Sequence, residues 1–82
     1  MATYRVLLFS VLKQKVGDSM VHVEMVGSTT GRDLLDRLVA DYPLLADYRS
    51  IVRMAVNHEY AREDVRLSPT DEIALITPVS GG

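Results

Sequence analysis

The stretch Glu72-Ile73-Ala74-Leu75-Ile76-Thr77 is a nearly continuous apolar run. A run of this length bounded by turn residues is typical of a strand in the middle of a sheet, covered on both faces. The preceding Leu67-Ser68-Pro69-Thr70-Asp71 has the composition of a tight turn. Pro78 fixes φ and lacks an N–H, so regular pairing is expected to end there. The stretch therefore predicts a central, doubly covered strand, with the residues after it projecting beyond the sheet.

Two further apolar, β-branched runs lie at residues 4–9 and 21–26. The segment between them contains Gly17-Asp18, which favours a turn, so the two runs are predicted to form an antiparallel hairpin. In the second run, apolar residues alternate with His22 and Glu24, the pattern of a strand with one face in the core and one in water. The first run alternates less regularly and is interpreted as buried on both faces.

A single main helix is predicted to begin near Thr30 and to end near Asp41. The Thr30 hydroxyl can cap the helix, Asp33 stands three residues later as a capping-box partner, and Pro43 stops the helix. The apolar residues recur at helical spacing: Leu34, Leu35, Leu38, Val39 and Tyr42. The charged residues can pair at i,i+4 as Arg32/Asp36, Asp33/Arg37 and Arg37/Asp41.

The remaining elements complete an α+β pattern. Residues 51–56 are predicted to form a third strand that turns at Asn57-His58-Glu59 into a short extended piece around Tyr60, and residues 62–66 form a charged connection. The order of two strands, a helix and two strands predicts one sheet packed on one helix. Residues 1–82 are therefore expected to form a single domain.

The composition narrows the functional classes. The chain has 82 residues, of which 48% are hydrophobic and 24% charged, with a net charge of −2, as in an ordinary globular protein. The basic footprint of a nucleic-acid-binding protein is absent. Without cysteine there is no disulfide, thiolate metal site or thiol nucleophile. No segment approaches the roughly 20 apolar residues of a membrane helix, so a cytoplasmic location without membrane contact is expected.

The polar residues do not form a recognisable catalytic motif. The acidic pairs Glu63-Asp64 and Asp71-Glu72 are interpreted as solvated turns, and His22 and His58 lack a third ligand at metal spacing. No serine stands in a G-x-S-x-G sequence, and no glycine precedes a phosphate-loop lysine. The chain is therefore not expected to be an enzyme on its own, and no bound cofactor or metal is expected.

The final segment is the candidate functional group. Gly81 and Gly82 have no Cβ, so they can lie extended in a narrow slot and deliver a terminal carboxylate to another protein's active site. A frayed end is the alternative interpretation of this dipeptide. An ionised carboxylate, with a pKa of about 3.3–3.7, could attack the α-phosphate of ATP to give an acyl adenylate, using machinery supplied by a partner. Phe9, the only phenylalanine, is interpreted as a core residue, with an exposed partner anchor as the alternative.

Three segments together resemble the small subunit of molybdopterin synthase. They are the C-terminal segment from Asp71 to Gly82, which ends in Pro-Val-Ser-Gly-Gly, the Ala-Val-Asn-His-Glu-Tyr segment from Ala55 to Tyr60, and the Thr-Gly-Arg-Asp-Leu-Leu segment from Thr30 to Leu35. The likeness extends over essentially the whole chain. It implies a β-grasp, ubiquitin-like fold with a mixed sheet of about four to five strands on one main helix and an extended C-terminal Gly-Gly tail.

The resemblance also implies a mechanism. In this family the terminal glycine, here Gly82, is adenylated by a ubiquitin-activating-like adenylyltransferase with ATP and Mg²⁺ and then receives sulfur from a persulfide donor as a thiocarboxylate. The tail enters the active site of the large synthase subunit and supplies sulfur that converts cyclic pyranopterin monophosphate to molybdopterin. The two kinds of subunit form a heterotetramer, in which the small subunit donates sulfur and is not itself catalytic.

The family roles carry over by position. Gly82 is the sulfur-bearing residue, Gly81 supplies a slot-fitting backbone, and Pro78, Val79 and Ser80 belong to the inserted segment. Phe9 matches an aromatic residue of the first strand that contacts the large subunit. Thr77 stands where the family usually has a second proline, and Ser10-Val11-Leu12-Lys13 departs from the commoner first-loop sequence.

Other hypotheses remain beside this one. The chain could be another Gly-Gly sulfur carrier, such as the thiamine-pathway carrier, although that protein usually lacks Pro-Val-Ser before the glycines. It could be a ubiquitin-like modifier in which Gly82 forms an isopeptide with a lysine of a target. It could also be a β-grasp binding module with an inert tail.

Overall fold

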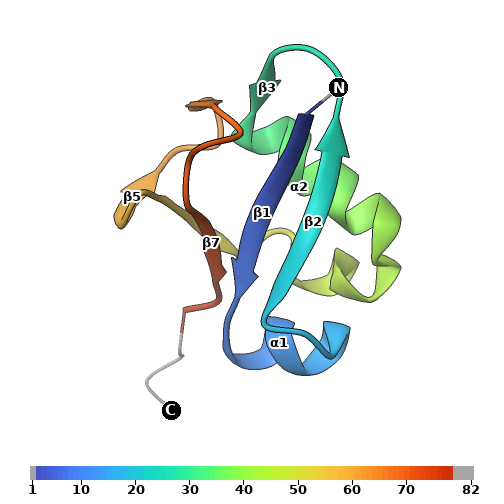
Figure 1. The fold of residues 1–82 in the computed structure, drawn as a ribbon. Helices are drawn as coiled ribbons and strands as arrows, with labels where there is room; N and C mark the ends of the chain where they lie inside the picture. The colour runs from blue at the N-terminus through green and yellow to red at the C-terminus, as the bar shows by residue number, and fades with distance from the viewer. Residues whose placement is uncertain (1, 79–82) are drawn as a thin grey trace.

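The computed structural model describes residues 2–78, whereas residue 1 and residues 79–82 lie outside the described part. A five-stranded mixed sheet in the order β2-β1-β7-β4-β5 is packed against the main helix α2, and two short strands, β3 and β6, pair separately (Figure 1). This arrangement confirms the predicted α+β, β-grasp fold. No helix within residues 2–78 is long and apolar enough to cross a membrane. The elements in chain order are β1 Ala2–Leu8, α1 Ser10–Val16, β2 Met20–Met25, β3 Thr29–Thr30, α2 Gly31–Asp41, the 3-10 helix η1 Pro43–Tyr48, β4 Arg53–Val56, β5 Glu59–Ala61, β6 Arg66–Leu67 and β7 Ile73–Ile76.

The predicted antiparallel hairpin of β1 and β2 is confirmed, but its connection is helical. Val6 lies opposite Val21, while α1 occupies most of the segment between the strands. Gly17 ends α1 in the left-handed conformation, with φ 92°, and its N–H bonds to the Lys13 carbonyl at 2.8 Å. The sequence showed the turn at Gly17 but not the helix, because seven residues are too few to display a helical period clearly.

The central position of β7 is confirmed, whereas its burial on both faces is wrong. The strand pairs in parallel with β1 and antiparallel with β4. Ile73 and Leu75 are buried on the core face, but Ala74 and Ile76 are only half-buried on the other face. The expected double burial of residues 4–9 is wrong for the same reason, since burial in β1 also alternates. The helix α2 covers one face of the sheet, and no helix within residues 2–78 covers the opposite face, which we call the open face (Figure 1).

The helix α2 has the predicted start and end. The Thr30 hydroxyl accepts a bond from the Asp33 N–H at 3.3 Å, and the Asp33 carboxylate accepts one from the Thr30 N–H at 3.1 Å. The helix ends at Asp41, and Pro43 begins η1. The predicted apolar stripe faces the sheet, and its fully buried members are Leu34, Leu35 and Leu38.

Of the predicted i,i+4 ion pairs, only Arg37 with Asp41 is present, at 3.3 Å. Asp36 instead contacts Arg49, and Arg32 lies 3.8 Å from Glu63, because these partners approach from other segments. Arg49 donates two 2.9 Å hydrogen bonds to the two carboxylate oxygens of Glu63. The bidentate bond from Arg49 lowers the pKa of the Glu63 carboxyl below its ordinary value. This cluster joins η1, α2 and the loop after β5.

We expect the Glu63 contribution to stability to depend on pH. Because the pKa is lowered on folding, the contribution is complete above the unfolded pKa of about 4.3 and is lost as the pH falls through the lower folded value. The variant Glu63→Gln should lose about 0.5–1 kcal/mol of unfolding free energy at pH 7, the range for a partly exposed ion pair. The difference from the parent should shrink below pH 4, as measured by urea denaturation. The control Glu59→Gln, at an exposed carboxylate of β5, should leave the unfolding free energy equal to that of the parent both at pH 7 and below pH 4.

Candidate functional site

The directions of three strands bring distant segments to one end of the sheet. Because β1 and β7 are parallel, with Leu8 opposite Leu75, Phe9 and residues 77–78 leave the sheet at the same end. The antiparallel strand β4 begins there, with Arg53 opposite Ile76. Figure 1 shows the arrows of β1 and β7 pointing the same way, towards α1. We call this the tail end of the sheet.

The predicted end of pairing at Pro78 is confirmed. The strand β7 stops at Ile76, Thr77 remains buried, and Pro78 is exposed. Thr77 therefore serves as the last core residue at the position where a second proline was expected. The other predicted tail residues, Val79, Ser80, Gly81 and Gly82, lie outside the described part of the chain.

Phe9 is exposed, so its interpretation as a core residue is wrong. The Leu8 side chain is in the core, and Phe9 directly follows the last residue of β1 in an extended conformation, with 45% of its surface exposed. Its carbonyl accepts the Leu12 N–H at 3.2 Å at the start of α1. The alternative, an aromatic residue available to a partner, is the one that agrees with this geometry.

A shallow hollow of about 400 Å³ lies on the open face beside Phe9. Most of its surface comes from apolar side chains, and Tyr60 on β5 is 74% exposed. An exposed patch of contiguous apolar side chains is characteristic of a surface that another protein covers. The residues around this hollow are Leu7, Phe9, Ala55, His58, Tyr60, Glu72, Ala74 and Ile76.

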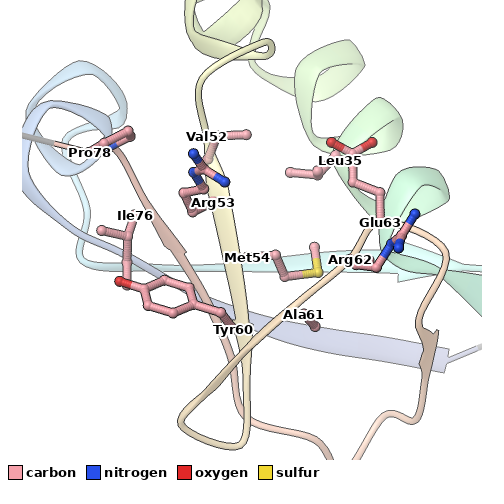
Figure 2. A pocket seen from close by; sticks show the side chains of 10 residues that line it. All are labelled: Leu35, Val52, Arg53, Met54, Tyr60, Ala61, Arg62, Glu63, Ile76 and Pro78. Carbon is pink, nitrogen blue, oxygen red and sulfur yellow. The ribbon is translucent and has the colours of Figure 1, made fainter.

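A second hollow, of about 660 Å³, lies between α2 and the edge formed by β4 and β5 (Figure 2). Tyr60 and Ile76 line both hollows, so the two adjoin along these residues, and the second hollow reaches Pro78; we call the two hollows together the strip. Besides these three residues, the second hollow is lined by Leu35, Val52, Arg53, Met54, Ala61, Arg62 and Glu63.

The turn between β4 and β5 fixes the far end of this strip. Asn57 and His58 both have positive φ, 53° and 73°, as in a tight two-residue hairpin turn. The Asn57 side chain donates to Asp71 at 3.0 Å and accepts the Glu72 N–H at 2.9 Å, while His58 Nε2 lies 2.8 Å from Glu72. Asp71 and Glu72 are thus structural turn residues, and His22 is an exposed residue of β2. Within residues 2–78 no group of three His, Asp or Glu side chains is placed to hold a metal ion.

Sequence reasoning identified Phe9 and Pro78 but missed the residues that connect them. The sequence pattern predicts Tyr60 and Ile76 only as parts of extended segments. In β4, Met54 is buried and Arg53 exposed, an alternation that could have placed Arg53 outside the core. Its position next to the tail depends on the pairing of β4 with β7, which the local pattern does not specify.

The family model described as the ThiS family matches residues 6–82. The chain belongs to this family. A curated relative from Arabidopsis thaliana, named molybdopterin synthase sulfur carrier subunit, is 36% identical and aligns over 95% of this chain and 81% of its own length. A relative of the same name from Mycobacterium tuberculosis is 34% identical over the whole of both chains. These similarities support a sulfur-carrier role.

Solved structures agree with the fold. The crystal structure of small archaeal modifier protein 1 from Haloferax volcanii matches with a TM-score of 0.87 and 29% identity, covering 96% of this chain and all of the other. The complex of subunits 1 and 2 of molybdopterin-converting factor from Helicobacter pylori contains a chain that matches with a TM-score of 0.67 and 18% identity, covering 98% of this chain and 99% of that one. This second likeness shows the shared fold.

Because Phe9 is exposed, we expect Phe9→Ala to change the unfolding free energy by less than about 1 kcal/mol, the usual range at the surface. Leu8→Ala, one residue earlier, should cost about 2–5 kcal/mol because it leaves a cavity in the core. Urea denaturation of both variants measures the difference. Equal destabilisation by the two substitutions would contradict the surface position of Phe9.

Proposed function

We propose that this chain is a sulfur carrier of molybdenum cofactor synthesis and that Gly82 bears the sulfur as a thiocarboxylate. The observation that carries the proposal is the position of Pro78. It leaves the sheet at the end where Phe9 is exposed and where the apolar hollow of the open face begins. A partner that covers this face would be in place to receive the segment that follows Pro78. Near full-length similarity to sulfur carrier subunits supports the same role.

The proposed chemistry has two stages. A carboxylate oxygen of Gly82 attacks the α-phosphate of ATP, pyrophosphate leaves, and an acyl adenylate forms with Mg²⁺ balancing the phosphate charge. A persulfide sulfur then attacks the activated carbonyl and displaces AMP. A thiol then attacks the donor-side sulfur of the resulting acyl disulfide, forms a new disulfide with the donor, and releases Gly82 as the thiocarboxylate. The adenylyltransferase supplies the ATP site, and a persulfide-bearing protein supplies the sulfur.

The proposed acceptor is the large subunit of molybdopterin synthase, with which the chain forms a heterotetramer. The Helicobacter pylori neighbour was solved as a complex of subunits 1 and 2, which supports this choice of partner. Val79, Ser80 and Gly81 form the inserted segment, and Gly81 keeps the chain narrow next to the sulfur. Sulfur passes from Gly82 to cyclic pyranopterin monophosphate, and the small subunit acts as the donor and not as the catalyst.

The test is the intact mass of the chain after incubation with its adenylyltransferase, Mg-ATP and a persulfide donor. The full chain should gain the mass that corresponds to replacement of one oxygen atom by sulfur. A variant lacking Gly82 should gain none, because the reactive carboxylate is then displaced by one residue. The modified chain should form molybdopterin when the large subunit and the pterin substrate are added.

The control is a known sulfur carrier treated with the same enzymes. If the control gains sulfur while this chain stays unmodified, the proposal fails for this pathway. If this chain gains sulfur but forms no molybdopterin with a competent large subunit, it is a sulfur carrier of another pathway, such as the thiamine type.

A second candidate function is protein modification, favoured by similarity to small archaeal modifier protein 1. The curated relative of that name from Haloferax volcanii is 34% identical over 92% of this chain, and its fold matches closely. A modifier would form isopeptide bonds from Gly82 to lysines of other proteins. Expression of a tagged chain should then give higher-mass conjugates that resist thiol reductants and disappear when Gly82 is deleted. Their absence would leave sulfur transfer as the function.

A further inference from the structure

Two exposed arginines lie in the hollow between α2 and the β4–β5 edge. Arg53 is the first residue of β4, and Arg62 directly follows β5. Both line the hollow, and Figure 2 shows their side chains on either side of Met54 in this view. Within residues 2–78, neither arginine makes an ion pair or a side-chain hydrogen bond, in contrast to Arg37 and Arg49.

The hollow is positively charged although the chain as a whole carries a charge of −2. Its one acidic lining residue is Glu63, and both oxygens of that carboxylate accept hydrogen bonds from Arg49. The charge of Glu63 is therefore balanced outside the hollow. Arg53 and Arg62 remain as two guanidinium groups with donors to offer an incoming anion.

Arg53 places part of this positive charge beside the end of β7, from which the tail continues. Arg53 lies opposite Ile76 in the pairing of β4 with β7, two residues before Pro78. Residues directly opposite on paired strands project from the same face, so Arg53 and Ile76 share the open face. Ile76 and Tyr60 also line the apolar hollow beside Phe9. Arg53 therefore lies beside the apolar surface at the place where the tail leaves the sheet, and Arg62 lines the same hollow farther from Pro78 (Figure 2).

We propose that Arg53 and Arg62 bind carboxylate side chains of the large synthase subunit at the root of the tail. This inference rests on the proposed function. Protein interfaces typically combine an apolar centre with a polar rim, and complementary charge at the rim orients the partners and speeds their association. A guanidinium binds a carboxylate through two parallel hydrogen bonds, which restrict the angle of approach. Contacts at Arg53 and Arg62 thus align the carrier so that the segment after Pro78 points into the acceptor.

The test is the affinity of the full chain for the large subunit from the same organism, measured by titration calorimetry. The two chosen salt concentrations are about 50 mM and about 500 mM NaCl, which screen charges less and more strongly than physiological salt does. The double variant Arg53→Gln/Arg62→Gln should bind about 5- to 20-fold more weakly than the parent at low salt, the sum of two rim ion pairs. At high salt the difference should fall to less than about twofold, because screening removes the contribution of exposed charges. Arg53→Glu should weaken binding more than Arg53→Gln.

The matched control is Arg37→Gln, at an exposed arginine on α2 that pairs with Asp41. It removes one positive charge without touching the hollow and should bind as the parent does. Circular dichroism of each variant confirms folding, and the change in salt dependence is a readout that a folding defect would not produce. If the double variant keeps the affinity and salt dependence of the parent while Phe9→Ala weakens binding, this inference is overturned and the proposed function stands. If the unsubstituted chain does not bind the large subunit, both are overturned.

Discussion

The parallel pairing of β1 with β7 is the constraint on which the arrangement of the site depends. Two parallel strands carry the residues after them to the same end of a sheet, so Phe9 and Pro78 lie at one end of the sheet although they are far apart in the sequence. The antiparallel strand β4 then begins at that end, which brings Arg53 there as well. Reversal of the β1–β7 pairing would place Phe9 and Pro78 at opposite ends of the sheet, and reversal of the β4–β7 pairing would move Arg53 away from Pro78.

The start of α2 is hydrogen-bonded to the loop after β5, which forms one wall of the strip. The Gly31 N–H bonds to the Val65 carbonyl at 3.0 Å, and the Arg32 N–H bonds to the Glu63 carbonyl at 2.8 Å. A Cβ on Gly31 would lie 2.9 Å from Met54 Sδ and 3.2 Å from the Glu63 carbonyl, so only glycine permits this close approach without a shift. Arg49 adds its two bonds to the Glu63 side chain. These contacts fix the loop after β5 and with it the wall of the hollow that contains Arg62.

Much of the fold was accessible from sequence because several signals are local. The capping box of Thr30 and Asp33, the turn at Gly17 and the end of pairing before Pro78 each depend on residues within a few positions of one another. Burial was harder to predict. An apolar run such as that of β7 suggests cover on both faces, whereas a sheet with one helical layer can bury only alternate residues completely. The half-buried residues of the run then contribute to the open face.

The sequence by itself determined the α+β order and the helix from Gly31 to Asp41, since these depend on periodicity and on local hydrogen bonding. The resemblance of its motifs to a known family added the β-grasp class and the chemistry proposed for Gly82. The tertiary structure decided that Phe9 is exposed and that Arg53 lies next to the root of the tail. Both facts depend on which strands pair and in which direction, and that choice is set by long-range packing against one face of the sheet. Local sequence specifies which segments form strands, whereas the burial of all strands in one core specifies how they pair and therefore which strand ends lie together.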